Sequence, residues 1–184
     1  GEVMQIIEDY QGATLAESTF NLVNALFKEY GILVLDGDQK ELKQLFAPIV
    51  KDELLNQRAS KAVSKSDEEL SKAGHAPQAH AREINLFLLA DQKRIRIQKN
   101  DTGYHCDGIG NFSEEELLKM LNDKPEQFSP NVILRPVYQE CILPNLCYVG
   151  GGGEMAYWLQ LKGLFEAYNT SYPLIQVRNS LLVI

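Results

Sequence analysis

The sequence has little cysteine and no excess of basic charge. Its 184 residues include three cysteines, Cys106, Cys141 and Cys147. An odd number without a CxxC pair indicates neither a disulfide framework nor a zinc site, and Cys141 and Cys147 are expected to be buried as small apolar residues. Lysine and arginine number 18 against 25 aspartates and glutamates, a formal net charge of −7. This balance argues against nucleic acid or an acidic membrane surface as a partner.

Targeting segments and common phosphate-binding motifs are also missing. No signal peptide and no apolar run of membrane-spanning length is present, so we expect a cytoplasmic protein without a membrane partner. There is no GxxxxGK[ST], and in the best register of GxGxxG the glycines Gly150 and Gly152 are followed by Met155 at the third position. The composition, 45% hydrophobic and 23% charged, is that of an ordinary globular chain of about one domain.

The most informative stretch predicts a strand, a glycine turn, a helix and a second strand. Residues 146–149 form a short apolar run between Pro144 and four glycines, Gly150 to Gly153, which is typical of a buried strand. From Glu154 the apolar residues recur with a helical period. They form a stripe of Tyr157, Trp158, Leu161, Leu164, Phe165 and Tyr168. The polar residues Gln160, Lys162 and Glu166 lie away from this stripe. Residues 174–177 are a second strand, and the crossover helix favours a parallel pair.

The rest of the chain alternates between predicted helices and strands. A helix over 15–30, ended by Gly31, precedes a strand at 32–35, and a helix opened at Asp38 restarts at Pro48. Residues 57–72 are too polar for a core helix and predict a mobile helical excursion. A buried strand at 84–89, a polar peripheral hairpin over 94–106 and a helix opened by the capping box at Ser113 follow. Residues 181–184 look like one more strand.

Several polar residues stand out against this background. Ligands of parallel sheets bind beyond the carboxyl ends of the strands, where the glycine turn lies, although a tight strand-to-helix connection explains the glycines equally well. Asn85 interrupts an apolar run and needs a hydrogen-bond partner. Arg135 is either a surface residue or an anion binder. His75 and His80 have no third ligand nearby, which favours a surface or substrate-contact role over a metal site.

Three blocks carry a resemblance to a known family. They read GHAPQAHAREINLF, FSPNVILRPVYQECILPNLCYVGGGGEMAYWLQLKGLFE and YPLIQVRNSLLVI. In order and spacing they resemble the bacillithiol-biosynthesis cysteine-adding enzymes, over nearly the whole chain from about Leu15. The resemblance implies an α/β fold, with a Rossmann-like nucleotidyltransferase-type core, a mostly parallel sheet flanked by helices and inserted connecting segments. Residues 1–56 and 113–184 would be portions of a partial core domain. Residues 57–112 would be a connecting segment with a core strand near 84–89 and the peripheral hairpin.

The resemblance also implies a function. The family's reaction is the last step of bacillithiol synthesis, in which a ligase adds cysteine to glucosaminyl-malate, and the ligase chemistry implies ATP with its binding place left open. The complete protein would be a homodimer through a coiled coil absent here. The first strands of the core would also be missing, so we expect the fragment to be inactive alone. Two alternatives stay open: another α/β nucleotide- or sugar-nucleotide-binding transferase domain, and a non-catalytic structural fragment.

The matching positions suggest a substrate-binding set without an evident catalytic residue or metal ligand. Trp158 has the alternative of a core residue, and Asn85 that of a partner for neighbouring backbone. Glu154 either orients the cysteine ammonium group or stabilises the start of its helix. The full predicted set is Gln78, Asn85, Arg135, Tyr148, Gly150, Gly151, Gly152, Gly153, Glu154, Trp158, Arg178, Asn179 and Ser180.

Overall fold

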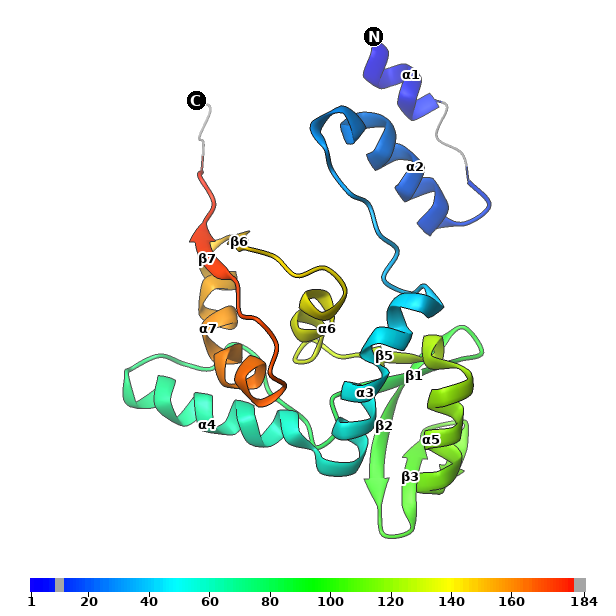
Figure 1. The fold of residues 1–184 in the computed structure, drawn as a ribbon, viewed down its shortest axis with the longest axis vertical. Helices are drawn as coiled ribbons and strands as arrows, with labels where there is room; N and C mark the ends of the chain where they lie inside the picture. Colours follow the sequence, from blue (N-terminus) through cyan, green and yellow to red (C-terminus); the bar gives the residue numbers. More distant parts are fainter. Residues whose placement is uncertain (9–11, 181–184) are drawn as a thin grey trace. The chain divides into compact units, whose positions relative to one another are not determined.

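A computed structural model describes residues 1–8 and 12–180, so the strand predicted at 181–184 lies outside the described residues (Figure 1). The chain divides into two compact units, residues 1–39 and residues 40–184. Each unit is described by itself. Within the described ranges, no helix has both the length and the apolar character that a membrane crossing requires.

The first unit is helical. It contains α1 (Glu2–Glu8), α2 (Leu15–Phe27) and a 3-10 turn, η1 (Lys28–Tyr30). Thr14 caps α2 by accepting a hydrogen bond from the Glu17 N–H, and Gly31 ends the helical segment with a φ of +71°, as predicted. The strand predicted at 32–35 is not formed. A strand exists only through its pairing, and the described part of this unit contains no other strand.

The second unit contains a five-stranded sheet whose neighbouring strands are all antiparallel (Figure 1). Its order is β4-β3-β2-β1-β5. The strands are β1 (Leu86–Ala90), β2 (Lys93–Asn100), β3 (Gly103–Cys106), β4 (Gly110–Phe112) and β5 (Phe128–Pro130). The predicted mostly parallel sheet is therefore wrong for the main sheet. The cause is the tight turns: β1 and β2 are joined through Asp91 and Gln92, both at positive φ, and a two-residue connection permits only antiparallel pairing.

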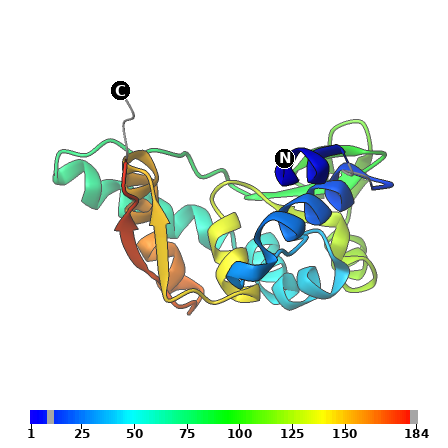
Figure 2. The ribbon, with the colours of Figure 1, turned by 90° about the horizontal axis from the view of Figure 1, so that it is seen from above.

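A separate parallel pair comprises β6 (Cys147–Gly150) and β7 (Leu174–Val177), seen as the yellow-orange and red arrows in Figure 2, which confirms the predicted parallel arrangement of these two segments. The pair leaves much of its surface open. Cys147 is exposed rather than buried, against the prediction, because its side chain lies on this thin sheet. Cys141 is half-buried and Cys106 is fully buried, where burial raises the pKa of the Cys106 thiol to about 11.

The predicted peripheral hairpin is part of the main core. It is formed by β2 and β3, as its alternation indicated, but Ile97 and Tyr104 are almost fully buried. The Tyr104 hydroxyl donates to the Leu54 carbonyl at 2.8 Å, which ties the hairpin to the helix beneath it. The polar residues that suggested a peripheral position, Arg94, Arg96 and Gln98, are exposed on the same strand.

Helices cover this sheet and the parallel pair. They are α3 (Lys40–Asn56), α4 (Arg58–Lys72), α5 (Glu114–Asp123), α6 (Arg135–Ile142) and α7 (Gly152–Ala167), with a 3-10 turn, η2 (Pro125–Gln127). The capping box at Ser113 is confirmed, with Glu116 as its partner. The break predicted at Pro48 is wrong, because α3 runs through it.

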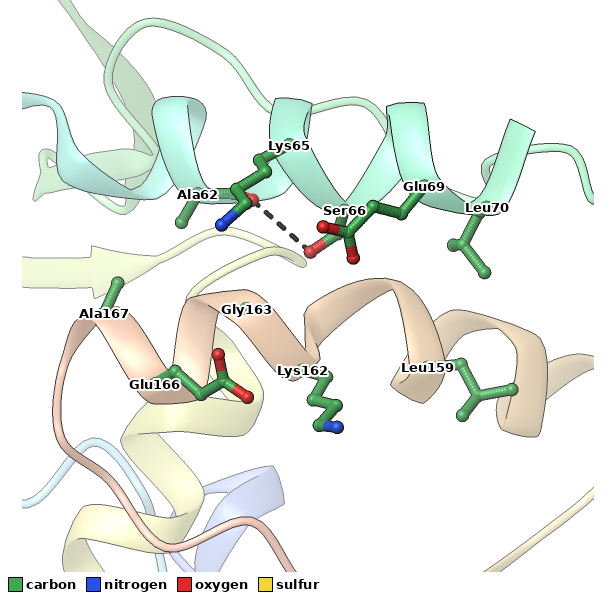
Figure 3. A pocket seen from close by; sticks show the side chains of 10 residues that line it. All are labelled: Ala62, Lys65, Ser66, Glu69, Leu70, Leu159, Lys162, Gly163, Glu166 and Ala167. Carbon is green, nitrogen blue, oxygen red and sulfur yellow. Dashed lines mark hydrogen bonds between the residues drawn. The ribbon is translucent and has the colours of Figure 1, made fainter. Parts of the chain in front are cut away.

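The segment predicted as a mobile excursion, α4, packs along α7 in an antiparallel arrangement (Figure 3). A Cβ on Gly163 of α7 would lie 2.7 Å from the Ser66 hydroxyl oxygen, so the glycine is what allows the two helices to approach. Val63 of α4 is fully buried. The many polar residues of α4 therefore lie mainly on its outer face, and its inner face is packed.

A buried carboxylate, Glu53, links the elements around it. The side chain has no exposed surface and accepts four hydrogen bonds. Its Oε1 accepts from the backbone N–H and side-chain amide of Asn85, at 3.0 and 2.8 Å. Its Oε2 accepts from the Ala59 N–H at 2.9 Å and from the Tyr168 hydroxyl at 2.9 Å. Glu53 of α3 thereby holds the start of α4, the end of α7 and the segment leading into β1.

We expect Glu53→Gln to destabilise the protein by roughly 2–4 kcal/mol, because an amide would turn two of its own N–H groups toward buried donors. Urea unfolding followed by circular dichroism measures the change. Glu68→Gln, which removes the same charge from an exposed position on α4, is expected to stay within about 0.5 kcal/mol. Equal free energies of unfolding for the two variants would contradict the role of Glu53.

A hydrogen-bond chain at the β3–β4 hairpin favours the protonated form of His105. The Asn100 side-chain oxygen accepts from the N–H and hydroxyl of Thr102, so its amide nitrogen faces the Asn111 Oδ1. The His105 Nδ1 lies 2.9 Å from that same oxygen, and its Nε2 lies 2.9 Å from Asp107 Oδ1. Both ring nitrogens therefore face acceptors, which only the imidazolium satisfies.

The acceptors Asn111 and Asp107 hold the pKa of His105 above its usual value. Because this pKa is raised in the folded state, protonated His105 stabilises the fold. Its contribution to the free energy of unfolding is complete below about pH 6.5, the ordinary pKa of histidine, and is lost as the pH rises through the folded-state pKa. We expect an NMR titration of the His105 ring to give a midpoint above about 6.5 and Asp107→Asn to lower it. An unchanged midpoint in the variant would show that Asp107 does not hold the proton.

Candidate functional site

The glycine turn connects β6 to α7 at the carboxyl end of the parallel pair, where Gly151 is the N-cap and the helix begins at Gly152. None of the four glycines uses a positive φ, so the turn does not need them for backbone conformation. Gly150 is needed for space, since a Cβ there would lie 2.8 Å from Tyr148 Cε1 and 3.2 Å from Glu154 Cβ. At Gly152 and Gly153 a Cβ would meet nothing within 4 Å. The helix start therefore faces open space.

The Glu154 side chain accepts hydrogen bonds from both sides of the glycine turn. Its Oε2 accepts from the Gly151 N–H at 2.7 Å, and its Oε1 accepts from the Tyr148 hydroxyl at 2.7 Å. These two hydrogen bonds, from Gly151 first and then Tyr148, lower the pKa of the Glu154 carboxyl, with the nearby Arg178 charge adding to the shift. The carboxylate thus acts as the cap of α7, which is one of the two roles considered for it.

Arg178 brings positive charge to the turn. Its backbone N–H donates to the Gly150 carbonyl at 2.8 Å, which continues the pairing between β6 and β7. Its Nη2 lies 3.4 Å from the position that a Cβ would take on Gly151. Asn179 and Ser180 follow it and are exposed. The guanidinium therefore lies against the turn beside the free start of the helix.

An aromatic cavity of about 240 Å³ lies beside the turn. Its walls come from α6 and the segment before it, from β6 and from α7, and it is lined by Val132, Arg135, Pro136, Gln139, Tyr148, Tyr157 and Trp158. The Tyr148 and Trp158 rings are 4.4 Å apart at their centroids, and the Tyr157 hydroxyl donates to the Val132 carbonyl. Burial, followed by the hydrogen bond to Glu154, raises the pKa of Tyr148. Tyr148 is the shared residue, since its ring lines the cavity and its hydroxyl holds Glu154.

The two ends of this cavity differ in exposure. Trp158 is 2% exposed and packs on Phe165 and Tyr172, so it forms the floor. Arg135 begins α6 beside Pro136 and is exposed. A ligand in the cavity would have aromatic rings on one side and a guanidinium on the other.

Two predicted residues, Gln78 and Asn85, have no described contact with the glycine turn. Asn85 is fully buried, and besides Glu53 its side chain bonds Arg82 and Asn131. Gln78 is exposed, with its own side chain on the Ala76 carbonyl. The structure therefore collects the predicted residues from Arg135 onward around the turn and cavity, and leaves these two elsewhere.

Sequence reasoning missed Gln160, which fixes the segment containing Gln78. The side chain is fully buried; its Oε1 accepts from the N–H groups of Gln78 and Ala79, and its Nε2 donates to the Ala79 carbonyl and to Asp67. The helical period placed Gln160 away from the apolar stripe of α7, but the structure buries it completely, so the sequence contained no signal for this residue. Tyr157 was also missed as a cavity residue, because only the fold places it opposite Arg135.

A second concavity, of about 580 Å³, runs between α4 and α7 (Figure 3). Ala62, Ser66 and Gly163 form its narrow floor, and the other lining residues are Lys65, Glu69, Leu70, Leu159, Lys162, Glu166 and Ala167. None of the predicted site residues lines this groove. Across the described residues, no group of three histidine, cysteine or acidic side chains is placed to hold a metal ion.

These features define the class of the protein: an α/β chain with a glycine turn and helix start at the carboxyl end of a parallel pair. Residues 2–179 match the family described as "Bacillithiol biosynthesis BshC, N-terminal Rossmann-like domain". The chain belongs to this family. The match supports the Rossmann-like α/β class predicted from the sequence, with the main sheet corrected to antiparallel.

Relatives of the same family are found in several bacteria. A protein of Flavobacterium johnsoniae is 48% identical over 170 residues, covering 92% of this chain and 32% of its own length. A protein of Cytophaga hutchinsonii is 42% identical over 186 residues, with 95% and 35% covered, and one of Bacillus cereus is 29% identical over 178 residues, with 94% and 33% covered. Each carries the name "Putative cysteine ligase BshC". The chain spans about a third of the length of these relatives.

The glycines should differ in their tolerance of alanine. We expect Gly150→Ala to destabilise the protein by about 1–3 kcal/mol, because the Tyr148 ring that it would touch is stacked on Trp158 and cannot move freely. Gly153→Ala is the matched control and should be neutral or stabilising by up to about 1 kcal/mol, since it adds a helix-favouring residue in open space. Urea unfolding of both variants measures the difference, and equal effects would contradict the close approach at Gly150.

Proposed function

We propose that the chain is the Rossmann-like portion of a cysteine ligase that adds cysteine to glucosaminyl-malate in the last step of bacillithiol biosynthesis. The observation that carries this proposal is family membership over residues 2–179, with an open glycine turn beside Arg178 inside the matched region. The relatives' name supports a ligase. The activity belongs to the whole protein, of which this chain is about a third by the length of its relatives.

Ligase chemistry sets requirements for the site. An amide forms between a carboxylate and an amine only after the carboxylate has been activated, by transfer of an adenylyl or phosphoryl group from a nucleotide such as ATP. Negative charge develops during that transfer, and preorganised N–H donors and cations stabilise it. The start of α7 at Gly152 and Gly153 supplies open N–H donors, and Arg178 supplies the cation.

The remaining residues are assigned either to holding the turn or to lining the cavity. The two oxygens of Glu154 already accept from Gly151 and Tyr148, so we assign this residue to holding the turn rather than to binding the cysteine ammonium group. Arg135, Tyr148 and Tyr157 line a cavity large enough for a small polar group. We assign that cavity to part of a substrate, with Arg135 facing a carboxylate.

The wider expectations complete this proposal. We propose cysteine and glucosaminyl-malate as the small-molecule substrates, ATP as the activating cofactor and a cytoplasmic location. We also propose that the complete protein is a homodimer through a coiled coil and that these 184 residues alone do not complete the reaction. A soluble ligase of small metabolites fits a chain whose net charge of −7 disfavours nucleic acid.

Calorimetric titration of the 184-residue chain with glucosaminyl-malate and with ATP, separately, tests the placement. We expect Arg178→Gln to weaken the binding of the ligand held at the turn by about tenfold or more, the loss of a charge-assisted contact. Lys162→Gln, which removes the same charge from the exposed face of α7, should change it less than twofold. Gly152→Ala should also weaken binding without lowering stability, because its methyl group would occupy the open space above the turn.

Two results would contradict the assignment. Binding of either ligand with equal affinity in the wild-type chain, Arg178→Gln and Gly152→Ala would remove the turn from the site. A folded wild-type chain that binds neither glucosaminyl-malate nor ATP would show that this portion is a scaffold and that the ligands are held elsewhere in the complete protein.

A further inference from the structure

A small basic notch lies where β2 extends beyond its pairing with β1, and no residue of the glycine turn lines it. It has a volume of about 250 Å³ and is formed by residues 82–84, before β1, and residues 96–99 of β2. Its lining residues are Arg82, Glu83, Ile84, Arg96, Ile97, Gln98 and Lys99. We refer to this cavity as the β2 notch.

The register of the sheet creates the notch. The described pairing between β1 and β2 starts at Phe87 and Arg96, and β2 continues to Asn100 while it pairs with β3 on its other side. The chain before β1 turns away at Asn85. Residues 97–99 of β2 are therefore unpaired on the side facing β1, and the diverging segment leaves a space there.

A buried anchor fixes one wall of the notch. The Asn85 Oδ1 accepts from the Arg82 N–H at 3.0 Å, and its Nδ2 donates to the Arg82 carbonyl at 2.8 Å. Asn85 is fully buried and is itself bonded to Glu53. The backbone that presents the Arg82 side chain is thus attached to the interior, although the side chain is exposed.

The cations of the notch are available to a ligand. Arg82, Arg96 and Lys99 form no ion pair within the described residues. Arg96 lies 5.9 Å from the Phe87 ring centroid and Lys99 lies 6.0 Å from that of Tyr104, contacts that hold a cation without using its N–H groups. Glu83 is the acidic lining residue. Residues 82–99 hold five basic and two acidic residues in a chain of net charge −7, so positive charge is concentrated here.

We propose that the β2 notch binds the phosphate or diphosphate group of a small molecule. Arg82 and Arg96 present planar N–H forks that match phosphate oxygens. Lys99 is three residues beyond Arg96 on β2 and therefore lies on the opposite face, so it adds a point charge from the other side of the unpaired edge. The volume suits a phosphate or diphosphate but lies below the usual range for a whole drug-sized ligand. The rest of the molecule would extend outward over the exposed side of β2. The proposal rests on these cations and is independent of the ligase assignment.

Backbone NMR shifts and calorimetry of the 184-residue chain with inorganic pyrophosphate test the site. We expect shift changes at Arg82, Arg96 and Lys99, and Arg96→Gln or Lys99→Gln should weaken binding by about tenfold or more. Lys93→Gln is the matched control, since Lys93 is exposed at the start of the same strand and does not line the notch. It should change affinity less than twofold.

Separate titrations with ATP and citrate identify the ligand chemistry. Shifts at the notch with ATP as well as pyrophosphate support a nucleotide as the source of the phosphate, and shifts with pyrophosphate alone support an inorganic or smaller phosphate. Citrate that binds the notch as tightly as pyrophosphate would overturn the phosphate assignment. Shifts confined to Gly151 and Arg178, or equal losses in the Arg96, Lys99 and Lys93 variants, would overturn the site while leaving the glycine-turn proposal unaffected.

Discussion

The buried carboxylate of Glu53 is the constraint on which the second unit depends. A carboxylate without exposed surface is costly unless hydrogen bonds replace its water, and four donors do so here. Those donors come from the entry to β1, the start of α4 and the end of α7. The same group thus fixes α7, which begins at the glycine turn, and Asn85, which holds the backbone of Arg82 at the β2 notch.

The local parts of the fold could be predicted from the sequence. The capping box of Ser113 and Glu116 needs only neighbouring residues, and the β6–α7–β7 unit was recognisable from a short apolar run, four glycines and a change of period. The main sheet could not be predicted in the same way. Its antiparallel order depends on the two-residue turn at Asp91 and Gln92, which contains no glycine and so lacks the usual hairpin signal.

The candidate site shows the same division between local and distant information. The glycines and Arg178 were predicted, but their uses differ: Gly150 makes room for side chains, whereas Gly152 and Gly153 leave open space. Asn85 was noticed because it interrupts an apolar run, but its partner Glu53 is 32 residues away along the chain. Gln160 likewise bonds a segment more than 80 residues earlier. Pairings of this range are set by packing, which no local pattern records.

The cavity and the glycine turn are connected through Tyr148. Its ring stacks on Trp158 as part of the cavity wall, and its hydroxyl donates to the carboxylate of Glu154, which in turn accepts from the Gly151 N–H. Gly150 has no room for a Cβ because this ring and Glu154 lie against it. Movement of the Tyr148 ring would therefore remove one of the hydrogen bonds that hold Glu154 in place. Trp158 is buried beneath the ring and limits that movement, so the packing of two aromatic side chains supports the geometry of the turn at the start of α7.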